Sequence, residues 1–238
     1  EIYDGCCSNC FTIVNSNSVK ADNLIVLIPS AGPGNIGIQS PQEVLNEFLP
    51  LIAANSKIII PHFHSLENFS STNNKGLMIQ GYSQLSEMVQ ETIVILNHFI
   101  PHFGATMSHI TIGGKSIGAT VALLMGAICP TISGVFALDP VILGKEVTNE
   151  ALMIPYFNRF TEMEEVIAMN LNHKLLLVTN EKLAIPNNKQ LIQIKKNSVS
   201  LSVVNKWILS MIKKKQVPLQ SIPLTRVDLD HRKFNITK

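Results

Sequence analysis

The segment 114–118 of the chain reads GKSIG and places Ser116 between two glycines. A serine in a G-x-S-x-G pattern can act as a nucleophile when the chain turns sharply from a strand into a helix around it, because the turn lifts the hydroxyl above the sheet. Small residues at Gly114 and Gly118 keep the neighbouring backbone from clashing with that turn. The pattern therefore indicates a nucleophilic serine at position 116.

The flanking sequence has the composition that this turn requires. Residues 109–112 (HITI) predict a strand, and residues 117–128 (IGATVALLMGAI) predict a helix. A helix that begins directly after the serine points its first amides toward a developing oxyanion, so we expect the N–H of Ile117 to be one donor. An ordinary glycine-rich junction is the alternative. A phosphate loop is excluded, because G-x-x-x-x-G-K-S needs glycine where the chain has His109.

The rest of the chain alternates between apolar strand-like runs and amphipathic helical stretches. Further strands are predicted at 11–14, 24–29, 57–60, 133–138, 174–179 and 224–229, and further helices at 40–54, at 82–99 and from about 203. This alternation favours a doubly wound α/β fold with a mostly parallel sheet and helices on both faces. We expect a single domain over residues 1–238, with an N-terminal extension at 1–23 and a lid or insertion at 143–172.

A second motif, ALDP at 137–140, stands at the end of the strand predicted after the serine helix. With GKSIG it makes the chain resemble the α/β-hydrolases over about residues 24–234, and in particular chlorophyllases, platelet-activating-factor acetylhydrolases and pancreatic-type lipases. Those enzymes place the acid of a catalytic triad at the position that Asp139 matches. Most other α/β-hydrolases place it one strand later, where Glu181 is the rival acid. An aspartate before proline is also common in ordinary turns.

The base of such a triad follows the acid in the chain. His173 and His231 are the two histidines after Asp139. His173 precedes a predicted strand and would lie at the wrong end of the sheet, whereas His231 follows the last predicted strand. The resemblance therefore implies His231 as the base. Asp228 and Asp230 stand close to it in the sequence and could also orient its imidazole.

The second oxyanion donor is expected from the loop after the strand at 24–29. Many α/β-hydrolases carry a His-Gly pair there, but this chain reads PSAGPG at 29–34 and has no histidine. Because only a backbone N–H is needed, the amide of Ser30 or of Ala31 could still serve. The alternative is a plain turn, which the proline and glycine content equally fits.

Together these residues imply a serine esterase that forms an acyl-enzyme with Ser116. Methionine, isoleucine, tyrosine and phenylalanine in 143–172 favour an apolar or lipid-like carboxylic ester, with chlorophyllase-like specificity as one version. The alternatives are an acyltransferase or thioesterase on the same fold, and a catalytically silent binding protein. No cofactor is implied. No metal is expected either, because the pair His62 and His64 has no identifiable third ligand.

The overall composition excludes several other classes. The chain has 238 residues, of which 46% are hydrophobic and 15% charged, so it has enough apolar surface to fold and is not intrinsically disordered. A formal net charge of +2 and the lack of a basic stripe argue against nucleic acid as a partner. No run of 18 uncharged apolar residues predicts a transmembrane segment. The composition carries no signal for an oligomeric state.

The cysteines and sequons leave the compartment open between a secreted or lumenal location and the cytoplasm. Cys6, Cys7 and Cys10 cluster near the N-terminus, and a disulfide among them or a bridge to Cys129 would suit a secreted protein. The segments NFS at 68–70 and NIT at 235–237 are glycosylation sequons. The chain begins with glutamate and not methionine, so we expect a processed or trimmed product.

Overall fold

The computed structural model describes residues 11–15, 23–30, 39–52, 56–63, 82–103, 109–129, 131–143, 162–185, 188–189, 191–194 and 201–212. The predicted strand at 224–229 and the base candidate His231 lie outside these residues, as do the two sequons. Within the described ranges, no helix is both long and apolar enough to span a bilayer.

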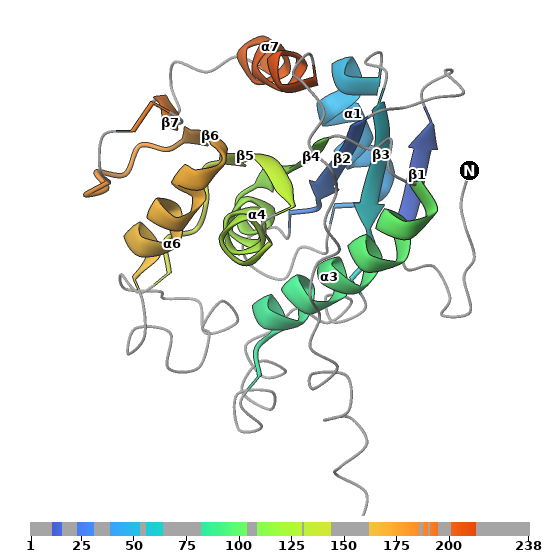
Figure 1. The fold of residues 1–238 in the computed structure, drawn as a ribbon, viewed down its shortest axis with the longest axis horizontal. Coiled ribbons are helices and arrows are strands. Elements are labelled where there is room, and N and C mark those ends of the chain that lie inside the picture. The colour runs from blue at the N-terminus through green and yellow to red at the C-terminus, as the bar shows by residue number, and fades with distance from the viewer. Residues whose placement is uncertain are drawn as a thin grey trace, which may run out of the picture.

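A single continuous sheet forms the centre of the described structure (Figure 1). Its seven strands lie in the order β1-β3-β2-β4-β5-β6-β7, and β1 alone runs antiparallel, paired with β3 at one edge. The strands are β1 (Phe11–Asn15), β2 (Asn23–Ile28), β3 (Ser56–Pro61), β4 (His109–Lys115), β5 (Ile132–Leu138), β6 (Lys174–Val178) and β7 (Leu191–Ile194). The predicted doubly wound, mostly parallel architecture is confirmed.

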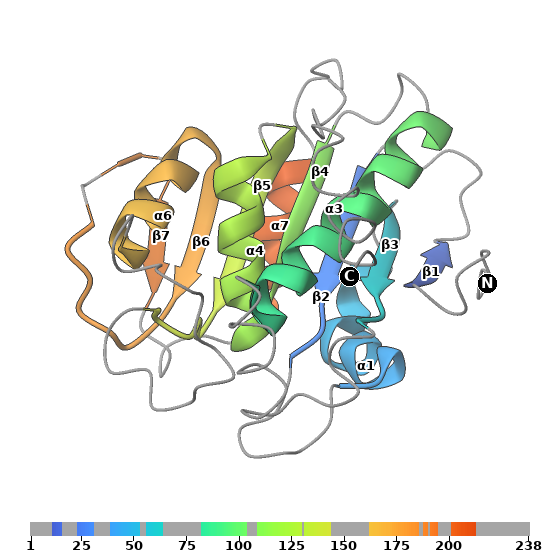
Figure 2. The ribbon, with the colours of Figure 1, turned by 90° about the horizontal axis from the view of Figure 1, so that it is seen from below.

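Helices cover both faces of this sheet. One face carries α1 (Pro41–Ile52) and α7 (Leu201–Ile212). The other carries α3 (Gln84–Phe103), α4 (Ile117–Ile128) and α6 (Met163–Met169), which Figure 2 shows in front of the strands with α7 behind. A short 3-10 turn at Asn170–Asn172 follows α6.

The side-chain alternation of β2 shows why this sheet needs two helical layers. All six of its residues are buried. Leu24, Val26 and Ile28 belong to the core beneath α3 and α4, whereas Ile25 and Leu27 belong to the core beneath α1 and α7. A strand that is apolar on both faces is stable only when both faces are covered, and this is the pattern expected of a central strand in a parallel sheet.

The chain changes direction in the sheet between β2 and β4. From β2 it passes through α1 to β3 on one side, and from β3 it returns through α3 on the other face to β4, which pairs with the opposite edge of β2. Such a switch point leaves a crevice at the carboxyl ends of the two strands, which is where open α/β sheets bind ligands. Functional side chains are therefore expected after β2 and after β4.

Two elements were not predicted from the sequence. β7 is a half-buried edge strand of four residues. Its segment LIQI is too short to give a clear strand pattern in the sequence. The helix α6 lies inside 143–172 and packs on α4, where the Nδ2 of Asn170 donates hydrogen bonds to the carbonyls of Leu123 and Val166, each at 2.8 Å. Of the segment 143–172, where a lid or insertion is expected, residues 144–161 lie outside the described residues.

The structure corrects the expectation for one cysteine. Cys129, at the C-terminal end of α4, is a buried free thiol, so the suggested bridge to Cys129 is wrong. Burial raises the pKa of this thiol to about 12, so it stays protonated and is a poor nucleophile. Cys6, Cys7 and Cys10 lie outside the described residues.

His173 joins the amino-terminal edge of the sheet to the end of α4. Its Nε2 donates to the carbonyl of Gly126 at 3.0 Å. Burial lowers the pKa of the imidazole below its ordinary value of 6.5, and the hydrogen bond to Gly126 only partly opposes this. The folded protein therefore holds His173 neutral at a pH where the unfolded chain already binds a proton.

We expect the free energy of unfolding to fall as the pH drops below about 6.5, because the unfolded state then takes up more protons than the folded state. The variant His173→Gln should keep a donor to Gly126 and remove this titration. Urea unfolding at several pH values checks it: the stability difference between the wild-type protein and the variant should change between pH 7.5 and pH 5. A constant difference would contradict the assignment.

Candidate active site

The candidate site lies at the carboxyl ends of the central strands. Ser30 follows β2, Ser116 follows β4 and Asp139 follows β5. The backbone N–H of Ser116 donates to the carbonyl of Leu138 at 2.9 Å, so Ser116 and Asp139 begin their loops side by side. The structure thus brings the predicted nucleophile, the predicted acid and one predicted oxyanion donor to neighbouring strand ends.

Ser116 has the strained backbone that a nucleophilic serine at a sharp turn requires. Its φ is 52° and its ψ is −120°, in the region that favours glycine. It stands at the N-cap position of α4, where serine normally caps the helix with its hydroxyl, but its side chain makes no capping hydrogen bond. Ser116 is half buried, and its hydroxyl is not used to cap the helix.

The two glycines of the motif are required by a close approach of β2. A Cβ at Gly114 would lie 2.6 Å from the carbonyl oxygen of Ile28, and a Cβ at Gly118 would overlap the same oxygen and lie 2.9 Å from that of Pro29. These are backbone atoms of a buried strand end, so they cannot move aside as a flexible side chain would. Any larger residue at 114 or 118 would push β2 away from the serine turn.

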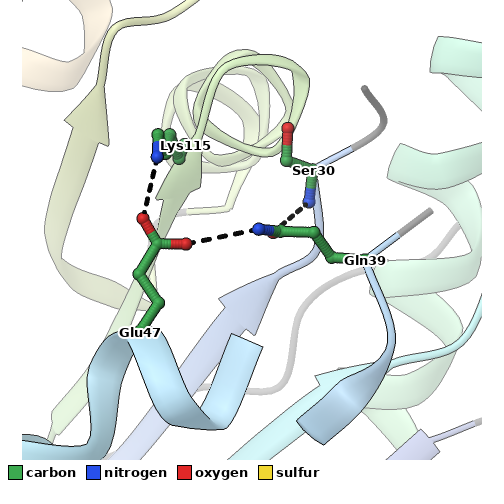
Figure 3. A network of polar contacts seen from close by, with 4 residues as sticks. All are labelled: Ser30, Gln39, Glu47 and Lys115. Atoms are coloured by element: carbon green, nitrogen blue, oxygen red, sulfur yellow. Dashed lines mark hydrogen bonds and ion pairs between the residues drawn. The ribbon is translucent and has the colours of Figure 1, made fainter. Parts of the chain in front are cut away.

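The first amide of α4 belongs to Ile117, directly after the serine, so the positive end of the helix dipole lies beside the hydroxyl. The other predicted donor, the N–H of Ser30, donates to the side-chain Oε1 of Gln39 at 3.2 Å (Figure 3). The N–H of Ser30 would have to leave Gln39 before it could serve an oxyanion. Ala31, the alternative, lies outside the described residues.

The two candidate acids differ in position and exposure. Asp139 is half buried, has a φ of 53°, and donates its backbone N–H to the carbonyl of Val178 at 2.7 Å. It follows β5, the strand that pairs with the serine strand. Glu181 is exposed and follows β6, one strand further from Ser116; its backbone N–H donates to the Oγ1 of Thr179 at 3.1 Å.

Thr120 connects the acid loop to the serine turn, a role that the sequence did not suggest. Its buried hydroxyl accepts a hydrogen bond from the N–H of Val141 at 2.9 Å and lies 3.0 Å from the carbonyl oxygen of Val141 and 3.3 Å from that of Ser116, to which it can donate. One side chain of α4 therefore fixes the loop that begins at Asp139.

Among the described residues, no three His, Cys, Asp or Glu side chains come together in a way that could hold a metal ion. His173 is the other histidine that follows Asp139 in the sequence. It lies at the amino-terminal ends of the strands, and its imidazole is hydrogen-bonded to the carbonyl of Gly126. It therefore lies at the opposite ends of the parallel strands from Ser116.

Solved structures share this architecture. Est1E from Butyrivibrio proteoclasticus has a TM-score of 0.54 at 13% identity, over 87% of this chain and 97% of that one. A lipase/esterase from Lactobacillus plantarum has a TM-score of 0.56 at 11% identity, over 84% and 91%. The protein TT1662 from Thermus thermophilus has a TM-score of 0.60 at 12% identity, over 86% and 94%. The chain has the α/β-hydrolase fold. No protein-family model and no curated protein matches the sequence significantly.

The connection after β7, the last described strand, bears on where a histidine base for Ser116 could come from. β7 ends at Ile194 and α7 begins at Leu201, and the residues between them read KKNSVS. This connection leaves the same edge of the sheet as the loop of Ser116, but it contains no histidine. This agrees with the expectation that the base follows the strand predicted at 224–229; His231 in that region lies outside the described residues.

Replacing Thr120 by valine should lower the free energy of unfolding by about 1 kcal/mol, because it leaves the partly buried N–H of Val141 without its acceptor. Thr120→Ser keeps the hydroxyl and should lose clearly less. Urea unfolding of both variants measures the difference. Equal losses would mean that packing of the methyl group, and not the hydroxyl, holds the acid loop.

Proposed function

We propose that this chain is a serine hydrolase that cleaves carboxylic esters through Ser116. The observation that carries the proposal is the strained backbone of Ser116, which stands at the switch point of the sheet with its hydroxyl unused by the helix it caps. Strain of this kind costs folding free energy and persists where the surrounding structure imposes it, often at functional sites. The likeness in fold to structures titled as esterases and lipases supports the same chemistry.

The proposed mechanism uses the three triad residues in their usual roles. His231 accepts the proton of the Ser116 hydroxyl while the oxygen attacks the ester carbonyl carbon. The resulting imidazolium, stabilised by the carboxylate of Asp139, then gives this proton to the departing alkoxide, so that an alcohol leaves and an acyl-enzyme remains. Water, deprotonated by the same imidazole, attacks the acyl group; the acid is released and Ser116 recovers its proton.

The negative charge of each tetrahedral intermediate needs two N–H donors. Ile117 supplies one at the start of α4. Ser30 or Ala31 supplies the second, and the hydrogen bond from Ser30 to Gln39 argues that Ser30 is not free to do so in the resting enzyme. An apolar or lipid-like acyl or alcohol group, chlorophyllase-like in one version, is the substrate that the composition of 143–172 supports.

A catalytically silent binding protein is the second candidate. It is favoured by one observation: the N–H of Ser30, a predicted oxyanion donor, is already bonded to the side chain of Gln39. If His231 does not reach Ser116, the serine would lack the imidazole base that the triad assigns to it. Labelling and turnover separate the two candidates.

A fluorophosphonate probe should label the wild-type protein at a single serine, and Ser116→Ala should abolish both the labelling and the hydrolysis of short p-nitrophenyl esters. The phosphorus centre is attacked only by an activated serine, so labelling reports the nucleophile without knowledge of the natural ester. Mass spectrometry of the labelled peptide identifies the residue. A wild-type protein that neither labels nor hydrolyses these esters would establish the silent candidate.

Asp139→Asn and Glu181→Gln, made in parallel with His231→Gln, should identify the other triad members. We expect Asp139→Asn and His231→Gln each to lower kcat by roughly 10³- to 10⁴-fold, because the serine loses its oriented base. Glu181→Gln should leave kcat close to the wild-type value. If Glu181→Gln alone removes turnover, the acid is Glu181 and the assignment of Asp139 is wrong.

A further inference from the structure

The backbone N–H of Ser30, one of the two candidates for the second oxyanion donor, already has an acceptor in the structure. It donates to the side-chain Oε1 of Gln39 at 3.2 Å (Figure 3). Ser30 is buried, and a buried N–H without an acceptor costs free energy, which the carboxamide oxygen of Gln39 avoids. Because an N–H carries a single proton, a full hydrogen bond to Gln39 excludes one to the oxygen of a substrate.

Two further contacts hold the side chain of Gln39 in this place. Its Nε2 donates to Glu47 Oε2 at 3.3 Å, and Lys115 Nζ donates to Glu47 Oε1 at 3.0 Å. Glu47 extends from α1 between these two side chains. A separate bond joins the backbones, since the N–H of Gln39 donates to the carbonyl of Ser30 at 2.9 Å. The side chain of Gln39 can therefore rotate away from Ser30 while the backbones stay together.

The acceptor that Gln39 offers resembles the oxygen of a substrate before the reaction. The carboxamide oxygen and the carbonyl oxygen of an ester are both neutral acceptors, so an ester gains little by displacing Gln39. A hydrogen bond to a charged oxygen is roughly twice as strong as one to a neutral oxygen. The oxyanion that forms when Ser116 attacks therefore displaces Gln39 favourably, but the broken contact is subtracted from that gain.

We propose that Gln39 is an autoinhibitory residue: its carboxamide occupies the oxyanion donor at Ser30 in the resting enzyme, and catalysis requires the side chain to rotate away. Glu47 strengthens the inhibition by holding Nε2 of Gln39, and Lys115 orients Glu47. This inference rests on the proposed esterase function, with Ser30 as the second donor, and adds a regulation to that site. It reconciles an engaged donor with an active serine.

The test removes the autoinhibitory contact in steps. Gln39→Leu keeps the approximate size of the side chain and removes both of its hydrogen bonds, while the backbone bond to Ser30 stays. Glu47→Leu leaves Gln39 in place and removes the acceptor of its Nε2. Gln42→Leu is the matched control, because Gln42 is an exposed glutamine of α1 whose Nε2 donates to Asn46 Oδ1 at 3.1 Å.

We expect Gln39→Leu to raise kcat/KM for a p-nitrophenyl ester, and the rate of fluorophosphonate labelling, by about two- to tenfold. One net hydrogen bond between neutral groups shifts the competent fraction by about that factor. Glu47→Leu should give a smaller increase, and the double variant should equal Gln39→Leu, because Glu47 acts through Gln39. Gln42→Leu should match the wild type. Partial unfolding lowers these rates, so it cannot imitate the expected increase.

The amide NMR signal of Ser30 tests the exchange of acceptors directly. In the free proteins, Gln39→Leu should shift this signal, because the N–H loses the carboxamide oxygen. After phosphonylation of Ser116, the wild type and Gln39→Leu should give nearly the same signal, because both then donate to the phosphonyl oxygen. A difference as large as that between the free proteins overturns the inference, because Ser30 then does not serve the oxyanion.

Failure of this inference and failure of the proposed function give different results. If the wild type labels and turns over, and Gln39→Leu has equal or lower rates per labelled site, the function stands and the autoinhibitory role is overturned. If neither protein labels or hydrolyses esters, the function is overturned and the role with it. An inert wild type with an active Gln39→Leu supports the inference, because the wild type is then silenced by Gln39.

Discussion

The close contact between the end of β2 and the two glycines of the serine turn is the constraint on which the site depends. The carbonyl oxygens of Ile28 and Pro29 occupy the space that a side chain at Gly114 or Gly118 would need. β2 and β4 are hydrogen-bonded neighbours in the sheet, so neither can move away without breaking their ladder. The chain must therefore turn from β4 into α4 in a very small space, and Ser116 takes the positive φ that results.

The carboxyl ends and the amino ends of the parallel strands carry different kinds of residues. At the carboxyl ends of the strands, Ser116 and Asp139 both have positive φ, and the hydroxyl of Thr120 holds the loop after β5 by a hydrogen bond. Glu47 accepts hydrogen bonds from Gln39 and Lys115 nearby. At the amino edge, His173 is held neutral by burial and closes the end of α4. His173 lies away from the serine turn because it precedes its strand, whereas Ser116 and Asp139 follow theirs.

The main elements could be predicted because their signals are local. The apolar run of β2, the capping residues at the start of α1 and the helical spacing in α3 each determine their own segment. Ser40 and Glu43 illustrate this, since the N–H of Ser40 donates to Glu43 Oε2 at 2.7 Å and that of Glu43 donates to Ser40 Oγ at 3.3 Å. β7 was missed because a half-buried edge strand of four residues gives too short a pattern to recognise, and α6 was missed because its segment was expected to be a lid or insertion.

The sequence by itself determined the serine turn: the order strand, glycine, serine, glycine, helix is local, and only that order permits the backbone of Ser116. The tertiary structure alone decided that β2 lies beside β4, so that Ser30 comes close to the turn and Lys115 meets Glu47 across 68 positions of the chain. The reason is physical. Strand order in a parallel sheet follows from which face each crossover helix covers, and that depends on packing between distant segments, which no local pattern of residues encodes.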